Sequence, residues 1–321
     1  MTLNVAIVGP GRSKQGTGPF IARTFDKLDC NVQAVVSSTA KSANAAVEML
    51  KSEYAIACEA YQSLDDVLMH HEVDVVAISS PAESHLEYLQ TAIDAGCHVF
   101  CEKPLSWPAE KMTSVKDVDL LTHQANQLVK QCNDNAVVLQ LNTQWPFTLP
   151  TFFELYPEFK QQNAISHFSM WLAPQSDGDT MIVDTFSHVF SMLYALVGTG
   201  KISNIESNFQ LRNESQDLKI EFQFLHARGD THVCVSLCSS DTFPKPAAYA
   251  INGHRVDRHV ELPNYLISLR SSDKQMPVVD PLESSIKNFI GSIHSKATSD
   301  EVALIDGTTH LAQIYLAVTQ P

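Results

Sequence analysis

The 321-residue chain lacks several features that mark particular classes of protein. It has no apolar run near the length that a bilayer span requires, and no basic segment precedes an apolar one at its N-terminus. It also lacks a basic cluster, since 36 acidic residues against 22 basic ones leave a formal net charge of −14. Nucleic-acid binding relies on Lys and Arg that displace counterions, so this balance argues against a DNA or RNA partner. We therefore expect a cytoplasmic globular protein without a membrane helix.

Patterns for disulfides and metals are missing as well. The seven cysteines include no Cys-x-x-Cys pair, and their odd number indicates reduced thiols. Cys97 with Cys101, and Cys234 with Cys238, are each four residues apart in strand-like runs, so we expect each pair to share one sheet face and to fill the core. The 13 histidines form no ligand spacing with neighbouring cysteines or carboxylates, so we predict no metal site.

What the chain does contain is an alternation of strand and helix patterns over its first half. Short apolar, largely β-branched runs stand at 4–8, 31–36, 74–79, 97–101 and 136–141. With helical periodicity between them, they predict a doubly wound parallel (Rossmann) sheet in a dinucleotide-binding domain of residues 1–143. Strand and turn signals dominate residues 144–321, where we expect an α+β substrate-binding and oligomerisation domain with a mostly antiparallel open sheet. The helices at about 281–321 are expected to pack back on the first domain.

The turn after the first strand carries a glycine cluster of the kind that binds phosphates. A dinucleotide fingerprint has a third glycine three residues after the second, and here that position is Lys14. The loop continues to further glycines before a helix, whose first N–H groups are suited to an anion. A tight turn without a ligand explains the same residues equally well. The predicted cofactor-binding residues of this loop are Gly9, Gly11, Arg12, Gly16 and Gly18.

The second strand ends without the carboxylate that binds the ribose 2′-hydroxyl of NAD. Hydroxyls and a lysine stand there, and they suit the 2′-phosphate of NADP. A helix cap at Ser42 accounts for part of the same run. We favour NADP over NAD, and the predicted contacts are Ser37, Ser38, Thr39 and Lys41.

Two further strands end in polar residues, Ser79-Ser80-Pro81 and Glu102-Lys103-Pro104. Parallel strands joined by right-handed crossovers end at one edge of the sheet, which is the edge where ligands bind. A buried strand that simply ends in a charged pair and a proline is the alternative. We include Ser79, Ser80, Pro81, Glu102 and Lys103 in the predicted cofactor site.

These residues resemble those of the glucose-fructose oxidoreductase and inositol dehydrogenase family of NAD(P)-dependent oxidoreductases. The resemblance rests on Gly9-Pro-Gly11, the 61–68 helix, Pro81 with His85, and the run from Ala95 to Pro104. It implies an enzyme that transfers a hydride between the nicotinamide and a secondary alcohol of a sugar, a polyol or a related cyclic hydroxy compound. It also implies that Lys103 is the catalytic lysine, reaching nicotinamide and substrate, that Pro104, often behind a cis bond, directs it, and that His85 belongs to the cofactor site.

In the second half, Asp184 and His188 lie one turn apart in a helix expected over residues 184–196. Such a pair is either an exposed helical pair or a carboxylate that orients an imidazole base. The family carries Asp-x-Gly-x-His-x-x-Asp here, and the resemblance implies that His188 accepts the proton and Asp184 supports it. This chain departs from that pattern at Phe186 and Ser191.

A second departure follows the last strand of the first domain, where the family often has an arginine and this chain has 142–146, Asn-Thr-Gln-Trp-Pro. Trp145 and Trp171 are suited to stacking on a sugar, although core packing is as common for tryptophan. The predicted substrate-binding residues are Lys103, Trp145, Asp184 and His188. An open sheet in the second domain suggests a homodimer or homotetramer. Two alternatives stay open: a regulatory protein that binds NADP and a sugar without catalysis, and an NAD-dependent redox-assisted glycosidase.

Overall fold

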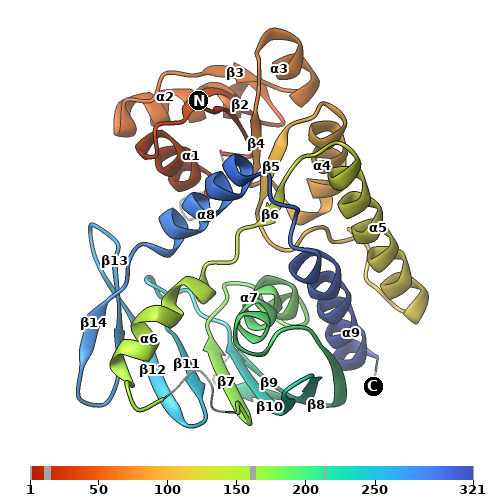
Figure 1. Ribbon diagram of the computed structural model, residues 1–321, viewed down its shortest axis with the longest axis vertical. Helices are drawn as coiled ribbons and strands as arrows, with labels where there is room; N and C mark the ends of the chain where they lie inside the picture. The colour runs from red at the N-terminus through yellow and green to blue at the C-terminus, as the bar shows by residue number, and fades with distance from the viewer. Residues whose placement is uncertain (1, 11–15, 160–163, 213–214, 321) are drawn as a thin grey trace. The chain divides into compact units, whose positions relative to one another are not determined.

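The structure, a computed structural model, describes residues 2–10, 16–159, 164–212 and 215–320. It divides into two compact units (Figure 1). Unit 1 comprises Met1–Lys111, Leu121–Asn142 and Leu282–Ile305, and unit 2 comprises Met112–Leu120, Thr143–Pro281 and Asp306–Pro321. One of the boundaries between the units lies between Asn142 and Thr143.

Unit 1 is built on a six-stranded sheet with the strand order β3-β2-β1-β4-β5-β6 (Figure 1). The strands are β1 (Asn4–Val8), β2 (Asn31–Val36), β3 (Glu59–Tyr61), β4 (Val75–Ile78), β5 (His98–Cys101) and β6 (Leu139–Leu141). All neighbouring strands pair in parallel. The central strands are apolar almost throughout because both faces of a parallel sheet are covered. The predicted Rossmann sheet is confirmed.

Helices cover both faces of this sheet, and the side chains of each strand alternate between two cores. The helices of unit 1 are α1 (Gly18–Lys27), α2 (Ala40–Tyr54), α3 (Leu64–His70), α4 (His85–Asp94), α5 (Val115–Asp134, mostly in this unit) and α8 (Pro281–Ser295). Ala6 and Val8 of β1 pack with residues of α3, α4 and α5, whereas Val5 and Ile7 pack with residues of α1, α2 and α8. This two-sided covering is the doubly wound arrangement.

The C-terminal helices divide between the units. Phe289 of α8 joins the core of unit 1, where its ring contacts Phe25 and Phe100. The last helix, α9 (Gly307–Thr319), belongs to unit 2 and packs against α7 (Thr180–Val197) and β8 (Gly200–Arg212). The expectation that both helices pack on the first domain is therefore wrong for α9, because an apolar stripe shows which side of a helix is buried but not which core receives it.

Unit 2 contains an eight-stranded sheet with the order β14-β13-β12-β11-β7-β10-β9-β8. Besides β8, its strands are β7 (His167–Leu172), β9 (Ser215–His226), β10 (Gly229–Cys238), β11 (Ala247–Ile251), β12 (His254–Glu261), β13 (Leu266–Arg270) and β14 (Gln275–Pro277). Only β7 and β10 pair in parallel among these described strands, so the predicted mostly antiparallel sheet is confirmed. The expected hairpin has Asn252 and Gly253 at φ +48° and +85°, as a tight primed turn requires.

The helix α7 supplies the core of unit 2 with the apolar stripe that its sequence predicts, Phe186, Val189, Phe190, Leu193 and Leu196. By length and composition α7 could cross a membrane, but 61% of it is buried inside the protein, as in a core helix. The short helices η2 (Trp145–Thr148) and α6 (Leu149–Leu155), which sequence patterns miss, precede β7.

The cysteine pairs differ from each other. Cys97 and Cys101 fill the same core of unit 1, as predicted. Cys234 is only partly buried and Cys238 is exposed, so the predicted core-filling role is wrong for the second pair. The reason is that β10 exposes this face, and only the alternate residues of the strand enter the core.

Candidate cofactor and catalytic site

The turn after β1 brings two strand ends of unit 1 into backbone contact. Gly9 has φ +79°, and a Cβ atom added to it would lie 2.6 Å from the backbone N of Ser80. A Cβ on Gly18, at the start of α1, would lie 2.7 Å from Oγ of Ser79. Only residues without a side chain fit at these two positions. This close approach is the backbone geometry that a dinucleotide pyrophosphate requires, so the residues present fit that group.

The rest of the predicted loop is described in part. Gly16 is partly buried just before α1, and Pro19 lies in the first turn of the helix, as its sequence predicts. Gly11 and Arg12 lie outside the described residues, and their predicted contacts stay predictions.

At the end of β2 the four predicted contacts have different surroundings. Ser37 is buried, its N–H donates to the carbonyl of Tyr61, and its hydroxyl has no hydrogen-bond partner among the described residues. Thr39 caps α2 by accepting from the N–H of Ser42 at 3.1 Å, so the cap that the sequence suggests at Ser42 is wrong. The cap lies three residues earlier because Thr39 has the extended backbone of a capping residue. Ser38 and Lys41 are exposed.

The residues that follow β4 are held against β1 and against the next helix. Ser79 donates from its backbone N–H and from its hydroxyl to the carbonyl of Val8, at 2.8 and 2.9 Å. The hydroxyl of Ser84 donates to that of Ser80 at 2.8 Å. Pro81 is exposed at the start of the short helix η1 (Ala82–Ser84). These bonds fix the β4 end beside the glycine turn.

His85 joins the ends of β4 and β5. Its side chain is 1% exposed, with Nε2 2.9 Å from the carbonyl oxygen of Ser80 and Nδ1 2.9 Å from that of Pro104. Its imidazole therefore holds the backbone of two loops at the carboxyl edge of the sheet. A direct contact between His85 and a cofactor stays a prediction.

The segment after β5 is fastened on two sides. The N–H of Glu102 donates to the carbonyl of Ile78, and its carboxylate accepts from the side chain of Asn142 at 2.6 Å. Asn142 in turn donates its backbone N–H to Cys101 at 2.7 Å. Burial, followed by the charge of Glu102, raises the pKa of Cys101 well above its usual range, so this thiol is neutral. Asn142 was not predicted, and its position directly after β6 was the available signal.

Lys103 stands in this fastened segment and is partly buried. The Lys103–Pro104 peptide bond is cis, as the resemblance implies. Unit 1 thus brings Gly9, Gly18, Ser79, Ser80, His85, Glu102 and Lys103 to the carboxyl edge of one parallel sheet.

Unit 2 holds the other predicted catalytic residues on α7. Asp184 is exposed and His188 is partly buried, one turn apart on a helix whose apolar stripe fills the core. Phe186, which replaces the glycine of the family pattern, is fully buried with its ring 5.9 Å from that of Phe190. The hydroxyl of Ser191 donates to the carbonyl of His188. Phe186 therefore departs from the pattern for a packing reason.

The two tryptophans that the sequence offers for sugar stacking lie in different surroundings. Trp145 is 7% exposed, meets Tyr249 edge-on at 6.0 Å, and has the guanidinium of Arg258 over its ring. Trp171 lies on the less covered face of the sheet under Arg255. Trp145 is therefore largely a core residue, which agrees with the packing alternative.

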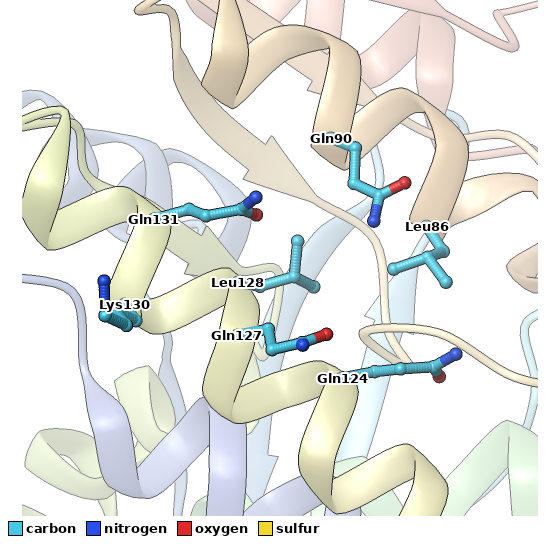
Figure 2. A pocket seen from close by; sticks show the side chains of 7 residues that line it. All are labelled: Leu86, Gln90, Gln124, Gln127, Leu128, Lys130 and Gln131. Atoms are coloured by element: carbon cyan, nitrogen blue, oxygen red, sulfur yellow. The ribbon is translucent and has the colours of Figure 1, made fainter.

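A pocket of about 190 Å³ lies between α4 and α5. Figure 2 shows its lining residues, Leu86, Gln90, Gln124, Gln127, Leu128, Lys130 and Gln131. None of the predicted site residues lines it. Among the described residues, no group of three or more His, Cys, Asp or Glu side chains is arranged to hold a metal ion.

The parallel sheet, the glycine turn and the polar strand ends define the class: a dinucleotide-binding protein of the Rossmann type. Residues 3–141 match the model of the oxidoreductase family with an NAD-binding Rossmann fold. This match covers the first domain of the chain, and there it confirms the resemblance seen in the sequence.

Curated relatives match part of the chain. The inositol 2-dehydrogenase of Salmonella typhimurium is 34% identical over 106 residues, which is 33% of this chain and 30% of that protein. The match therefore spans about a third of the length of such relatives. An oxidoreductase of Schizosaccharomyces pombe is 24% identical over 196 residues, or 56% of this chain and 50% of that protein.

Solved structures share the fold over nearly the whole chain. The UDP-N-acetylglucosamine 3-dehydrogenase of Acidithiobacillus ferrooxidans superposes with a TM-score of 0.69 at 17% identity, covering 99% of this chain and 98% of that one. At this identity the likeness shows the fold alone.

Proposed function

We propose that the protein is an NAD(P)-dependent oxidoreductase that transfers a hydride between a nicotinamide and a secondary alcohol of a sugar, polyol or related cyclic hydroxy compound. The observation that carries this proposal is Lys103, in a segment fastened by Glu102 and, through His85, at Pro104, at the sheet edge that also bears the Gly9 turn. A lysine with a constrained backbone at the ligand-binding edge of a Rossmann sheet is suited to chemistry.

For the cofactor we propose NADP in preference to NAD. The support is the end of β2, where the sequence has no carboxylate. This end offers the buried hydroxyl of Ser37, which has no hydrogen-bond partner within the described part of the chain, and the exposed Ser38 and Lys41. These donors suit a phosphate, although the hydroxyl of Thr39 is already engaged in capping α2. Titration with both cofactors tests this choice: we expect tighter binding of NADP and a selective loss of it in Lys41→Ala. Tighter binding of NAD would refute it.

When bound, the nicotinamide supplies the hydride acceptor or donor. The chain's own residues must then move a proton to or from the substrate hydroxyl. We propose that His188 takes this proton, that Asp184 supports the charged imidazole, and that Lys103 binds the same oxygen and stabilises its developing negative charge. In a variant of this scheme, Lys103 takes the proton and His188 binds the oxygen. Kinetic measurements on variants of the two residues distinguish these assignments.

The test is turnover of Lys103→Met and His188→Asn on a panel of sugars, cyclic polyols and dihydrodiols, read at the nicotinamide absorbance. Each change should lower kcat by about 100-fold or more, because a positioned acid or base contributes about that much. Lys116→Met and His123→Asn, both exposed on α5, are the matched controls. Near-normal rates in both site variants on a turned-over substrate would sink the mechanism.

A single-turnover experiment separates the proposal from its alternatives. Release of reduced cofactor in step with oxidised substrate supports an external hydride transfer. Cleavage of a glycoside without net cofactor reduction would indicate the redox-assisted glycosidase, and ligand binding without any turnover would indicate a regulatory protein.

We also propose that the protein is a homodimer or homotetramer formed through the less covered sheet face of unit 2. On that face of β10, His232, Cys234 and Ser236 are only partly buried. The residues that alternate with them are buried. An open sheet face of this kind is suited to pairing with a second copy. Light scattering of the purified chain gives the mass directly, and a monomer at micromolar concentration would refute the proposal.

A further inference from the structure

Two arginines on one strand of unit 2 each stack on a tryptophan ring, but only one of them has a carboxylate partner among the described residues. Arg255 and Arg258 both belong to β12, and each guanidinium lies over an indole: Arg255 over Trp171 at 4.2 Å and Arg258 over Trp145 at 5.4 Å. They are three residues apart, so they point to opposite faces of the sheet. Because both stack on an indole from the same strand, Arg255 serves as a control for Arg258.

Arg255 has its negative charge supplied by the protein. Its Nη2 lies 2.8 Å from Oδ1 of Asp257, and its Nε donates to the other carboxylate oxygen at 3.3 Å. The hydrogen bond with Asp257 raises the pKa of Arg255. This arginine is also exposed, so both the carboxylate and the solvent satisfy it.

Arg258 has no such charge partner among the described residues. Its Nη2 donates to the carbonyl of Lys245 at 2.7 Å, and its Nε is buried and has no hydrogen-bond partner there. It shares a sheet face with the fully buried Val256, and its stacking partner Trp145 is 7% exposed. Burial lowers the pKa of Arg258, an effect that Tyr265 opposes.

A guanidinium carries five N–H donors in a planar fork that matches a carboxylate or a phosphate. Removing such a cation from water without an anion is costly, and buried charges in proteins are therefore generally paired. The cation–π contact with Trp145 and one carbonyl offset only part of that cost. An anion would supply the partner that Arg258 lacks among the described residues.

We propose that Arg258, stacked on Trp145, binds an anionic oxygen group, a carboxylate or a phosphate, of the substrate. The identification of the ligand as the substrate rests on the proposed oxidoreductase function; the anion site itself rests on the geometry around Arg258. Specificity would follow, because a neutral sugar supplies no negative charge to this partly buried guanidinium.

The test uses three probes that differ only at C6: D-glucose, D-glucuronate and D-glucose 6-phosphate. Isothermal titration calorimetry of the full chain, with cofactor present, measures binding without turnover. We expect at least one of the two anions to bind the wild-type chain at least about 10-fold more tightly than glucose, since hydrogen bonds to charged groups are of that strength. The comparison of glucuronate with glucose 6-phosphate tells a carboxylate from a phosphate.

Arg258→Gln should remove this preference, and Arg255→Gln, the matched control, should retain it. Arg258→Lys keeps the charge without the fork and should bind the preferred anion several-fold more weakly than wild type; it carries the test if Arg258→Gln fails to fold. The inference is overturned if the wild-type chain shows no anion preference or no anion binding, or if the preference survives in Arg258→Gln or is unchanged in Arg258→Lys.

Hydride transfer is read separately at the nicotinamide absorbance on the same three sugars and the neutral panel. Arg258-dependent anion binding with no hydride transfer on any compound would refute the proposed function alone. Hydride transfer without an anion preference would refute this inference alone.

Discussion

Replacing Gly9 by alanine tests the contact on which the candidate cofactor site is built. The added Cβ would lie 2.6 Å from N and 2.7 Å from Cα of Ser80, and 2.9 Å from C of Ser79, whereas ordinary contacts are 3.4–4 Å. All three are backbone atoms, and Ser79 is held to Val8 by two hydrogen bonds, so this backbone cannot retreat without loosening them. The change therefore affects the meeting of β1 and β4 itself.

The cost has two parts. An alanine at φ +79° pays for the left-handed backbone, about 1–2 kcal/mol. Overpacking against rigid atoms adds about 1–3 kcal/mol. We expect Gly9→Ala to destabilise unit 1 by about 2–5 kcal/mol and to weaken dinucleotide binding, because the backbone can no longer approach the pyrophosphate.

Gly96→Ala is the matched control. Gly96 has nearly the same φ, +76°, but its added Cβ meets nothing within 4 Å, so only the backbone cost of about 1–2 kcal/mol applies. Urea unfolding followed by circular dichroism, with hydrogen exchange of peptides from β1 and β4 to report on unit 1, gives both values. Equal destabilisation by the two changes, or unaltered cofactor affinity in Gly9→Ala, would refute the reasoning.

Three further outcomes are expected. Phe289→Ala should destabilise unit 1 by about 3–5 kcal/mol, measured by the same hydrogen exchange, because the ring is fully buried in that core; a change confined to unit 2 would contradict this. Hydrogen bonds from Lys27 and then Lys287 lower the pKa of Glu283, so their stabilisation is present above its unfolded pKa and is lost as pH falls through the lower folded value. Glu283→Gln should thus flatten the acid limb of a stability–pH curve, and an unchanged limb would exclude the role. In thiol labelling at pH 8, the exposed Cys238 should react at least about 100-fold faster than Cys97, whose pKa burial raises to about 11, and similar rates would contradict this.

The fold of the first unit could be read from local sequence patterns. Apolar runs and helical stripes alternate at short spacings, and right-handed crossovers leave little choice of topology. The same rule puts Ser79 and Glu102 at one sheet edge, since the ends of parallel strands share it. The mostly antiparallel second sheet followed from strand and turn signals such as Asn252-Gly253, which the hairpin confirms.

The boundaries of helices and the elements that they pack against were harder to predict from the sequence. The cap of α2 is Thr39 rather than Ser42, because several hydroxyls compete and only the backbone conformation decides among them. The α9 stripe is visible in the sequence, but its neighbours α7 and β8 are not. In the sequence, Phe186 departs from the family pattern of site residues. In the structure it is a fully buried core residue.

The sequence by itself determined the parallel sheet, the glycine turn and the position of Lys103 after a strand, because each depends on residues that are near one another in the chain. Only the tertiary structure decided that Asn142 binds Glu102 across 40 residues, that His85 joins Ser80 to Pro104, and that Arg258 lies over Trp145 across 113 residues. Such contacts result from the packing of whole elements, which no local periodicity encodes. They hold the candidate catalytic segment in unit 1 and leave a partly buried guanidinium in unit 2 without a carboxylate partner among the described residues.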